Sequence, residues 1–124
     1  MKMTAWVTIA SLVMYIWTFS MVGRARGQYK VPAPLTDGPQ EFLIALRVQA
    51  NTVEQLVLFL PLLWMAAWYK DDQTAAVLGA IWVVGRVLYA LGYYSAPSKR
   101  SAGFMISSFA SAGLLISACI GLLH

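Results

Sequence analysis

The sequence predicts an all-α integral membrane protein built as a four-helix bundle, and three observations support this prediction. Apolar residues make up 60% of the 124 residues and charged residues only 11%, whereas a soluble domain carries roughly 25% charged residues. Four long apolar segments alternate with polar or proline-containing stretches. Because roughly 20 helical residues cross a bilayer core, four crossings use the whole chain, and residues 1–124 form a single domain.

The first predicted span covers residues 4–22, which carry no charge and have Trp6 and Trp17 near the ends, as expected of side chains at a membrane interface. The segment is too long for the core of a secretion signal, and no A-x-A cleavage pattern follows it, so we interpret it as a true span. It ends at the basic run that begins at Arg24. The prolines of the next segment, beginning with Pro32, exclude a regular helix there.

The second predicted span covers residues 39–69. Pro39 in the first turn and Glu41 near the positive end of the helix dipole are typical of a helix start. The short polar stretch 70–73 predicts a tight connection to the third span, residues 74–94. The second and third spans are therefore expected to be antiparallel neighbours in a helical hairpin.

The fourth predicted span covers residues 102–123 and is rich in Ser, Ala and Gly, which let helices approach closely in lipid. The connections between spans one and two and between spans three and four must lie on one side of the membrane. Together they carry the basic residues Arg24, Arg26, Lys30, Lys99 and Arg100, against only Lys2 and Lys70 on the other side. The positive-inside rule then places both connections in the cytoplasm and both termini on the opposite side.

The net charge of +4 does not indicate nucleic acid, because the basic residues form no dense stripe. The lipid bilayer, with its anionic lipids, or an anionic ligand near it is the expected partner. Cys119 is the single cysteine and His124 the single histidine. We therefore predict no disulfide framework and no metal site.

Three charges lie within the predicted spans, and each is costly there unless it has a function or a partner. They are Arg47, Glu54 and Arg86. Helical spacing places further polar residues on the same faces: Arg47, Asn51 and Glu54 on the second span, and Arg86, Tyr89 and Tyr93 on the third. We call each of these two sets of polar residues a stripe. The antiparallel topology brings both stripes into the cytoplasmic half of the membrane, at the level of Arg100, and so predicts one polar layer.

This polar layer suits a small zwitterionic anion, because arginines bind carboxylates, tyrosine hydroxyls donate hydrogen bonds and Glu54 can hold an ammonium. Glutathione has these groups: two carboxylates, one amine and a thiol. Arg100 stands at a helix amino terminus, where a cation opposes the dipole and calls for an anion such as a thiolate.

Structural explanations stand beside this one. Arg47 and Glu54 fit an ion pair that staples helices, and Tyr89 and Tyr93 fit interface aromatics. Lys99 and Arg100 also fit simple topology signals. The convergence of these residues at one depth favours a binding site.

The segment from Arg47 to Glu54, RVQANTVE, is similar to the R-x-Q-x-N-x-x-E signature of the MAPEG family, the membrane proteins of eicosanoid and glutathione metabolism. The stretch 32–42 resembles the loop before that signature, and the stretch 86–93 resembles the third-helix motif. Arg100 falls where those enzymes place a thiolate-stabilising arginine. The resemblance covers nearly the whole chain and is closest to microsomal glutathione transferase and leukotriene C synthase-like members.

The resemblance implies a homotrimer of four-helix subunits with glutathione, as co-substrate, bound between neighbours near the cytoplasmic face. It implies glutathione contacts from one subunit by Arg47, Asn51, Glu54, Tyr89 and Tyr93, contacts from the next by Arg26 and Gln49, and support from Arg86 beneath. Two positions depart from the leukotriene synthase pattern: Gln55 replaces a ligand-binding tyrosine, and Gly27 replaces a second arginine. These departures bear on glutathione affinity and substrate choice.

The expected function is a membrane-bound glutathione transferase or peroxidase, in which Arg100 stabilises the glutathione thiolate for attack on a lipophilic electrophile or a lipid hydroperoxide. One alternative is a non-catalytic, lipid-binding scaffold of the same family. Another is a small multidrug exporter, which is disfavoured because the first span lacks a membrane-embedded carboxylate.

Overall fold

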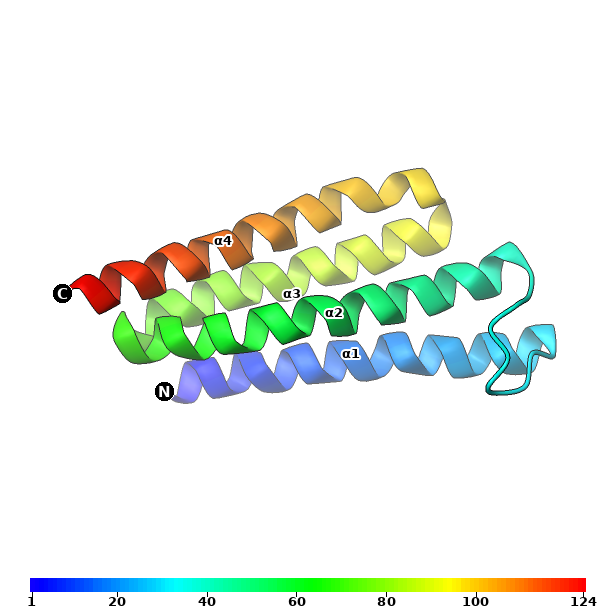
Figure 1. Ribbon diagram of the computed structural model, residues 1–124, viewed down its shortest axis with the longest axis horizontal. Helices are drawn as coiled ribbons and strands as arrows, with labels where there is room; N and C mark the ends of the chain where they lie inside the picture. The colour runs from blue at the N-terminus through cyan, green and yellow to red at the C-terminus, as the bar shows by residue number, and fades with distance from the viewer.

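The computed structural model describes the whole chain, residues 1–124, as four long helices joined in sequence. They are α1 (Lys2–Tyr29), α2 (Gln40–Tyr69), α3 (Asp72–Ser95) and α4 (Ser101–Leu123), with a short 3-10 helix, η1 (Pro97–Arg100), ahead of α4. Figure 1 shows the helices side by side with both termini at one end of the bundle. We call the other end, which holds the loop 30–39 and the α3–α4 connection, the loop end. All four helices are long and apolar enough to cross a membrane, which confirms the predicted all-α class with four spans.

Helix α1 is longer than the predicted first span, because it continues past Val22 through the basic run to Tyr29. No proline interrupts this stretch, and arginine is a good helix former. The helix ends at Lys30, which adopts a left-handed conformation with φ 56° and donates its backbone N–H to the carbonyl of Arg26. Helices α1 and α2 consequently project beyond α3 and α4 at the loop end (Figure 1).

The α2–α3 connection fastens α1 to α3 at the end that holds the termini. Asp71 caps α3 by accepting a hydrogen bond from the backbone N–H of Thr74 at 2.6 Å, and this bond holds the pKa of Asp71 below its ordinary value. The carboxylate of Asp72 accepts the backbone N–H groups of Met3 at 3.2 Å and Thr4 at 2.9 Å, together with the Thr4 hydroxyl. The first N–H groups of a helix have no partner within it, so Asp72 caps α1 from a different helix.

Replacing Asp72 with alanine is expected to loosen the start of α1, because three donors lose their acceptor at once. Water at this exposed end partly replaces the lost bonds, so we expect a small but measurable fall in the unfolding temperature. Thermal unfolding in detergent and amide hydrogen exchange near Thr4 measure the effect. Asp37→Ala, in the exposed loop, is the matched control. Equal stability of the two variants would contradict the capping role.

Large apolar side chains fill the middle of the bundle and also cover its outside. Phe59 of α2 stacks on Trp82 of α3 with ring centroids 3.8 Å apart, and Leu63 and Leu114 pack there without exposure. Exposed apolar side chains occur on every helix, among them Trp6, Val57, Trp68, Val84 and Phe109. An apolar outer surface is suited to contact with lipid tails.

Helices α3 and α4 approach most closely at two glycines. A Cβ on Gly85 would lie 2.8 Å from the backbone nitrogen of Ser107, and a Cβ on Gly103 would lie 2.6 Å from the carbonyl oxygen of Gly85. Small residues at such contacts let helix backbones meet in a membrane. The contact also brings Tyr89 to within 6.2 Å of Phe104, measured between ring centroids, and so forms one wall of the cavity described next.

Candidate functional site

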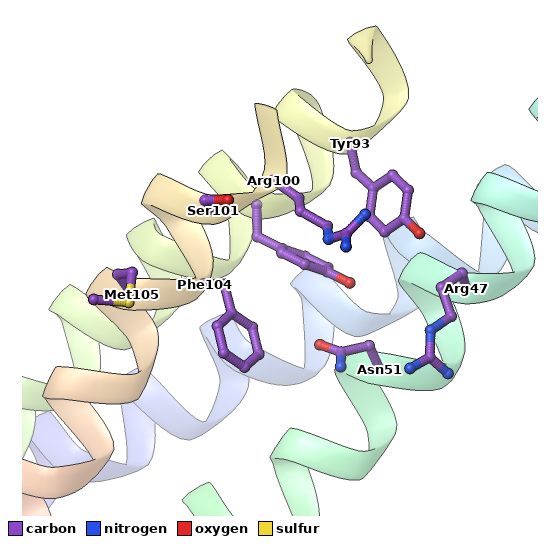
Figure 2. Close-up of a pocket in the computed structure, with 8 residues that line it drawn as sticks. Arg47, Asn51, Tyr93, Arg100, Ser101, Phe104 and Met105 are labelled. Atoms are coloured by element: carbon purple, nitrogen blue, oxygen red, sulfur yellow. The ribbon is translucent and has the colours of Figure 1, made fainter. Parts of the chain in front are cut away.

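A cavity of about 410 Å³ lies between α2, α3 and the start of α4. Its lining residues come from all three helices and η1: Arg47, Asn51, Tyr89, Tyr93, Arg100, Ser101, Phe104 and Met105. Figure 2 shows Arg47 and Asn51 on α2 facing Arg100 and Tyr93 across the cavity, with Phe104 of α4 pointing toward α2. The volume is at the lower end of the range typical of small-molecule sites.

Helical periodicity explains why these side chains meet. Arg47 and Asn51 are four residues apart on α2, and Tyr89 and Tyr93 are four residues apart on α3, so each pair presents one face. The two tyrosine rings meet edge to face with centroids 5.7 Å apart, and the Arg100 guanidinium carbon lies 5.1 Å from the centre of the Tyr93 ring. The cavity therefore joins the two predicted stripes to Arg100.

The cavity is electropositive. Arg47 and Arg100 line it, no carboxylate does, and neither arginine forms an ion pair within 4.0 Å. The hydrogen bond that Arg100 makes, from Nη1 to the carbonyl of Pro97, is 3.3 Å long. Two guanidinium groups free to pair make the cavity suitable for an anion with more than one negative group.

One side of the cavity is polar and the other is apolar. The amide of Asn51 and the phenols of Tyr89 and Tyr93 can donate and accept hydrogen bonds, and Asn51 Oδ1 is buried without a partner. Phe104 and Met105 follow Arg100 along α4 and are exposed on the outer surface. An anion held here would contact the arginines on the polar side. On the other side it would face Phe104 and Met105, which open toward the apolar outer surface.

Arg86 is fully buried and contacts Tyr89, one of the residues that line the cavity, while its role as a supporting residue stays a prediction. Its Nη2 donates to Thr52 Oγ1 at 2.9 Å, and its guanidinium carbon lies 4.1 Å from the centre of the Tyr89 ring. Its Nε and Nη1 have no hydrogen-bond partner. Arg86 therefore places a buried positive charge against the ring of Tyr89, one of the residues that line the cavity.

Three other predicted ligands lie outside this cavity. Glu54 is exposed on α2 and forms no ion pair with Arg47, so the alternative of a structural pair between them is wrong for the single chain. Gln49 Nε2 donates to the hydroxyl of Tyr15 on α1 at 2.9 Å. Arg26 Nη1 donates to the carbonyls of the loop residues Val31 and Leu35, at 3.2 and 2.7 Å. Within one chain, these three residues do not meet Arg100.

Sequence reasoning did not single out Thr52, Ser101 or Met105. Ser101, Phe104 and Met105 follow the spacing i, i+3 and i+4 on α4, so the helical spacing that identified the other stripes could have found them. Thr52 directly follows Asn51, but its bond to Arg86 depends on how α2 and α3 are rotated against each other. No spacing rule reports that rotation.

Comparison with known proteins finds relatives over nearly the whole chain. The model of the MAPEG family matches residues 3–120. An uncharacterized protein of Synechocystis sp. is 46% identical over 119 residues, which cover 96% of this chain and 87% of that protein. Human microsomal glutathione S-transferase 2 is 38% identical over 116 residues, which cover 94% and 79%. Leukotriene C4 synthase of Cavia porcellus is 36% identical over 119 residues, which cover 96% and 79%.

Proposed function

The chain belongs to the MAPEG family and is a multi-pass membrane protein, and from this premise we propose that it is a glutathione transferase with peroxidase capacity toward lipid hydroperoxides. The single observation that carries the proposal is the electropositive cavity with Arg47 and Arg100 unpaired beside the apolar start of α4. Relatives named for glutathione transfer and for leukotriene C4 synthesis supply the chemical context.

Glutathione matches the cavity group by group. The Arg47 guanidinium pairs with a glutathione carboxylate, and the Arg100 guanidinium pairs with the thiolate. Asn51 and the two tyrosines form hydrogen bonds with the peptide groups of glutathione. Glu54 lies about one helical turn beyond Asn51 on α2, and its carboxylate can pair with the glutathione ammonium. Arg86 packs against the Tyr89 ring and adds positive potential to the cavity.

We further propose that the protein works as a homotrimer in which Arg26 and Gln49 reach glutathione from the neighbouring subunit. The exposed carboxylate of Glu54, without an ion-pair partner on a membrane helix, supports a contact beyond the single chain, because such a charge is costly against lipid. The basic loops favour the cytoplasmic side for the loop end and thus for the mouth of the site.

The chemistry requires no protein nucleophile. The glutathione thiolate, held against Arg100, forms a carbon–sulfur bond with an electrophile while the leaving group departs or an opened epoxide oxygen takes up a proton. With a hydroperoxide, two glutathione molecules are oxidised to the disulfide while the hydroperoxide is reduced to an alcohol and water. Holding both reactants at one interface supplies proximity.

The experiment that tests this function is a glutathione titration of the purified protein, read at the ultraviolet absorbance of the thiolate, followed by turnover assays. We expect a saturable thiolate signal and glutathione-dependent turnover of a generic electrophile, of a lipid hydroperoxide, or of both. A non-catalytic scaffold would show neither. Binding of glutathione without any thiolate signal would also contradict the proposal, because the role of Arg100 would be lost.

A further inference from the structure

A second cavity, of about 330 Å³, lies at the loop end, apart from the glutathione cavity and sharing no residue with it. It is enclosed by α1, the start of α2 and the last turn of α3. Its lining residues are Met21, Arg24, Ala25, Gln28, Tyr29, Glu41, Ile44, Ala45 and Tyr94. Figure 1 shows that α1 and α2 project past α3 at this end. We call this second cavity the recess.

Opposite charges face this recess from different helices. Arg24 comes from α1 and Glu41 from α2; both are exposed, and neither forms an ion pair within 4.0 Å. A simple anion would leave Glu41 unpaired next to it, and a simple cation would leave Arg24 unpaired. The wall therefore fits a ligand that carries both signs of charge a short distance apart.

The Tyr94 ring closes the recess at the end of α3. Its hydroxyl oxygen is buried in the bundle and is not accessible from the recess. The ring is held edge to face against Trp17 of α1, with centroids 5.8 Å apart, so its position is fixed by packing. Tyr94, Glu41 and Ile44 also border an adjoining hollow of about 210 Å³, which extends the recess along the end of α3.

The recess lies at the depth of lipid headgroups. Arg24 is the first charge after the long uncharged stretch of α1, and Ile16 and Phe19, in the turns below it, are exposed apolar side chains. Tyr29, one turn above Arg24, is typical of interface aromatics. A ligand anchored in hydrocarbon would present its headgroup at this level.

We propose that this recess binds the headgroup of phosphatidylethanolamine. The phosphate pairs with Arg24, while the primary ammonium donates to the Glu41 carboxylate. Phosphatidylcholine satisfies the same charges, but its quaternary ammonium cannot donate a hydrogen bond. Phosphatidylglycerol offers a phosphate and no cation, so it leaves the carboxylate of Glu41 unpaired. The site is independent of glutathione binding.

The test is native mass spectrometry of the purified, detergent-solubilised protein titrated separately with three phospholipids of equal chain length. We expect phosphatidylethanolamine to bind about tenfold more tightly than phosphatidylcholine or phosphatidylglycerol, the difference expected for one charge-assisted hydrogen bond. Free O-phosphoethanolamine should bind far more weakly, because it lacks the acyl anchor. Equal binding of the three lipids, tighter binding of phosphatidylglycerol, or equal binding of the free headgroup would each overturn the proposal.

Variants locate the site. Glu41→Gln should abolish the preference for phosphatidylethanolamine over phosphatidylcholine. Arg24→Gln should weaken the binding of all three lipids. Tyr94→Phe removes a hydroxyl that is not accessible from the recess, so it should change neither the binding nor the headgroup preference. Lys30→Gln and Asp37→Asn change the same kinds of charge at the loop end outside the recess and serve as matched controls. If these controls lower binding as much as the recess variants, general surface electrostatics explains the result and the site is refuted.

Discussion

Arg100→Ala is expected to lower glutathione-dependent turnover by about 10²- to 10³-fold, the cost typical of removing one preorganised group that stabilises developing negative charge. Of the two cavity arginines, Arg100 is the one that directly precedes α4, the helix of Phe104 and Met105, where a lipophilic acceptor would approach. Without its guanidinium, the thiol loses the interaction that favours the thiolate. The midpoint of the thiolate titration should then move upward toward about 8.5, the ordinary value for a thiol.

The measurement is a pair of curves for each variant: thiolate absorbance against pH, and turnover against glutathione concentration. Lys99→Ala is the matched control, because Lys99 is the adjacent exposed cation and does not line the cavity. Arg100→Lys keeps the charge and should retain part of the thiolate signal. Full turnover in Arg100→Ala, or an equal loss in Lys99→Ala, would remove Arg100 from the mechanism.

The cavity could largely be predicted from sequence because its main residues obey helical spacing on two antiparallel helices. Once α2 and α3 form a hairpin, the depth of Arg47 and Asn51 on one helix fixes which turn of the other lies beside them. The position of Arg100 follows from the short connection after α3. These are local rules, and each operates within a helix or across a tight turn.

The contacts that sequence reasoning could not predict depend on packing between elements. Within one chain, the Arg26 guanidinium donates to the loop carbonyls of Val31 and Leu35. Gln49 shares a helix with Arg47, yet it faces Tyr15 on α1. A hydrogen bond between distant segments depends on the rotation of each helix, and a single sequence does not report that rotation. The roles of Arg26 and Gln49 in an assembled trimer stay predictions.

The α3–α4 contact determines whether the cavity forms at all, because its wall exists only while the two backbones touch. Gly103 lies against Gly85 and the backbone of Tyr89, and a Cβ there would come within 2.6 Å of both the Gly85 carbonyl oxygen and the Tyr89 Cα. Backbone atoms on a packed helix cannot rotate aside as a flexible side chain can. The helices must therefore separate, and Tyr89 must move away from Phe104.

Gly103→Ala is accordingly expected to lower the free energy of unfolding by about 3 kcal/mol, the upper end of the usual range for overpacking. The same change should weaken glutathione binding. Gly23→Ala is the matched control, since a Cβ there meets no atom within 4 Å. Alanine in a helix interior is favoured over glycine by roughly 0.5–1 kcal/mol, so the control should be slightly stabilised. Thermal unfolding in detergent and the glutathione titration measure both effects. If Gly103→Ala unfolds at the temperature of the unmodified protein and binds glutathione normally, then the close α3–α4 contact does not shape the site.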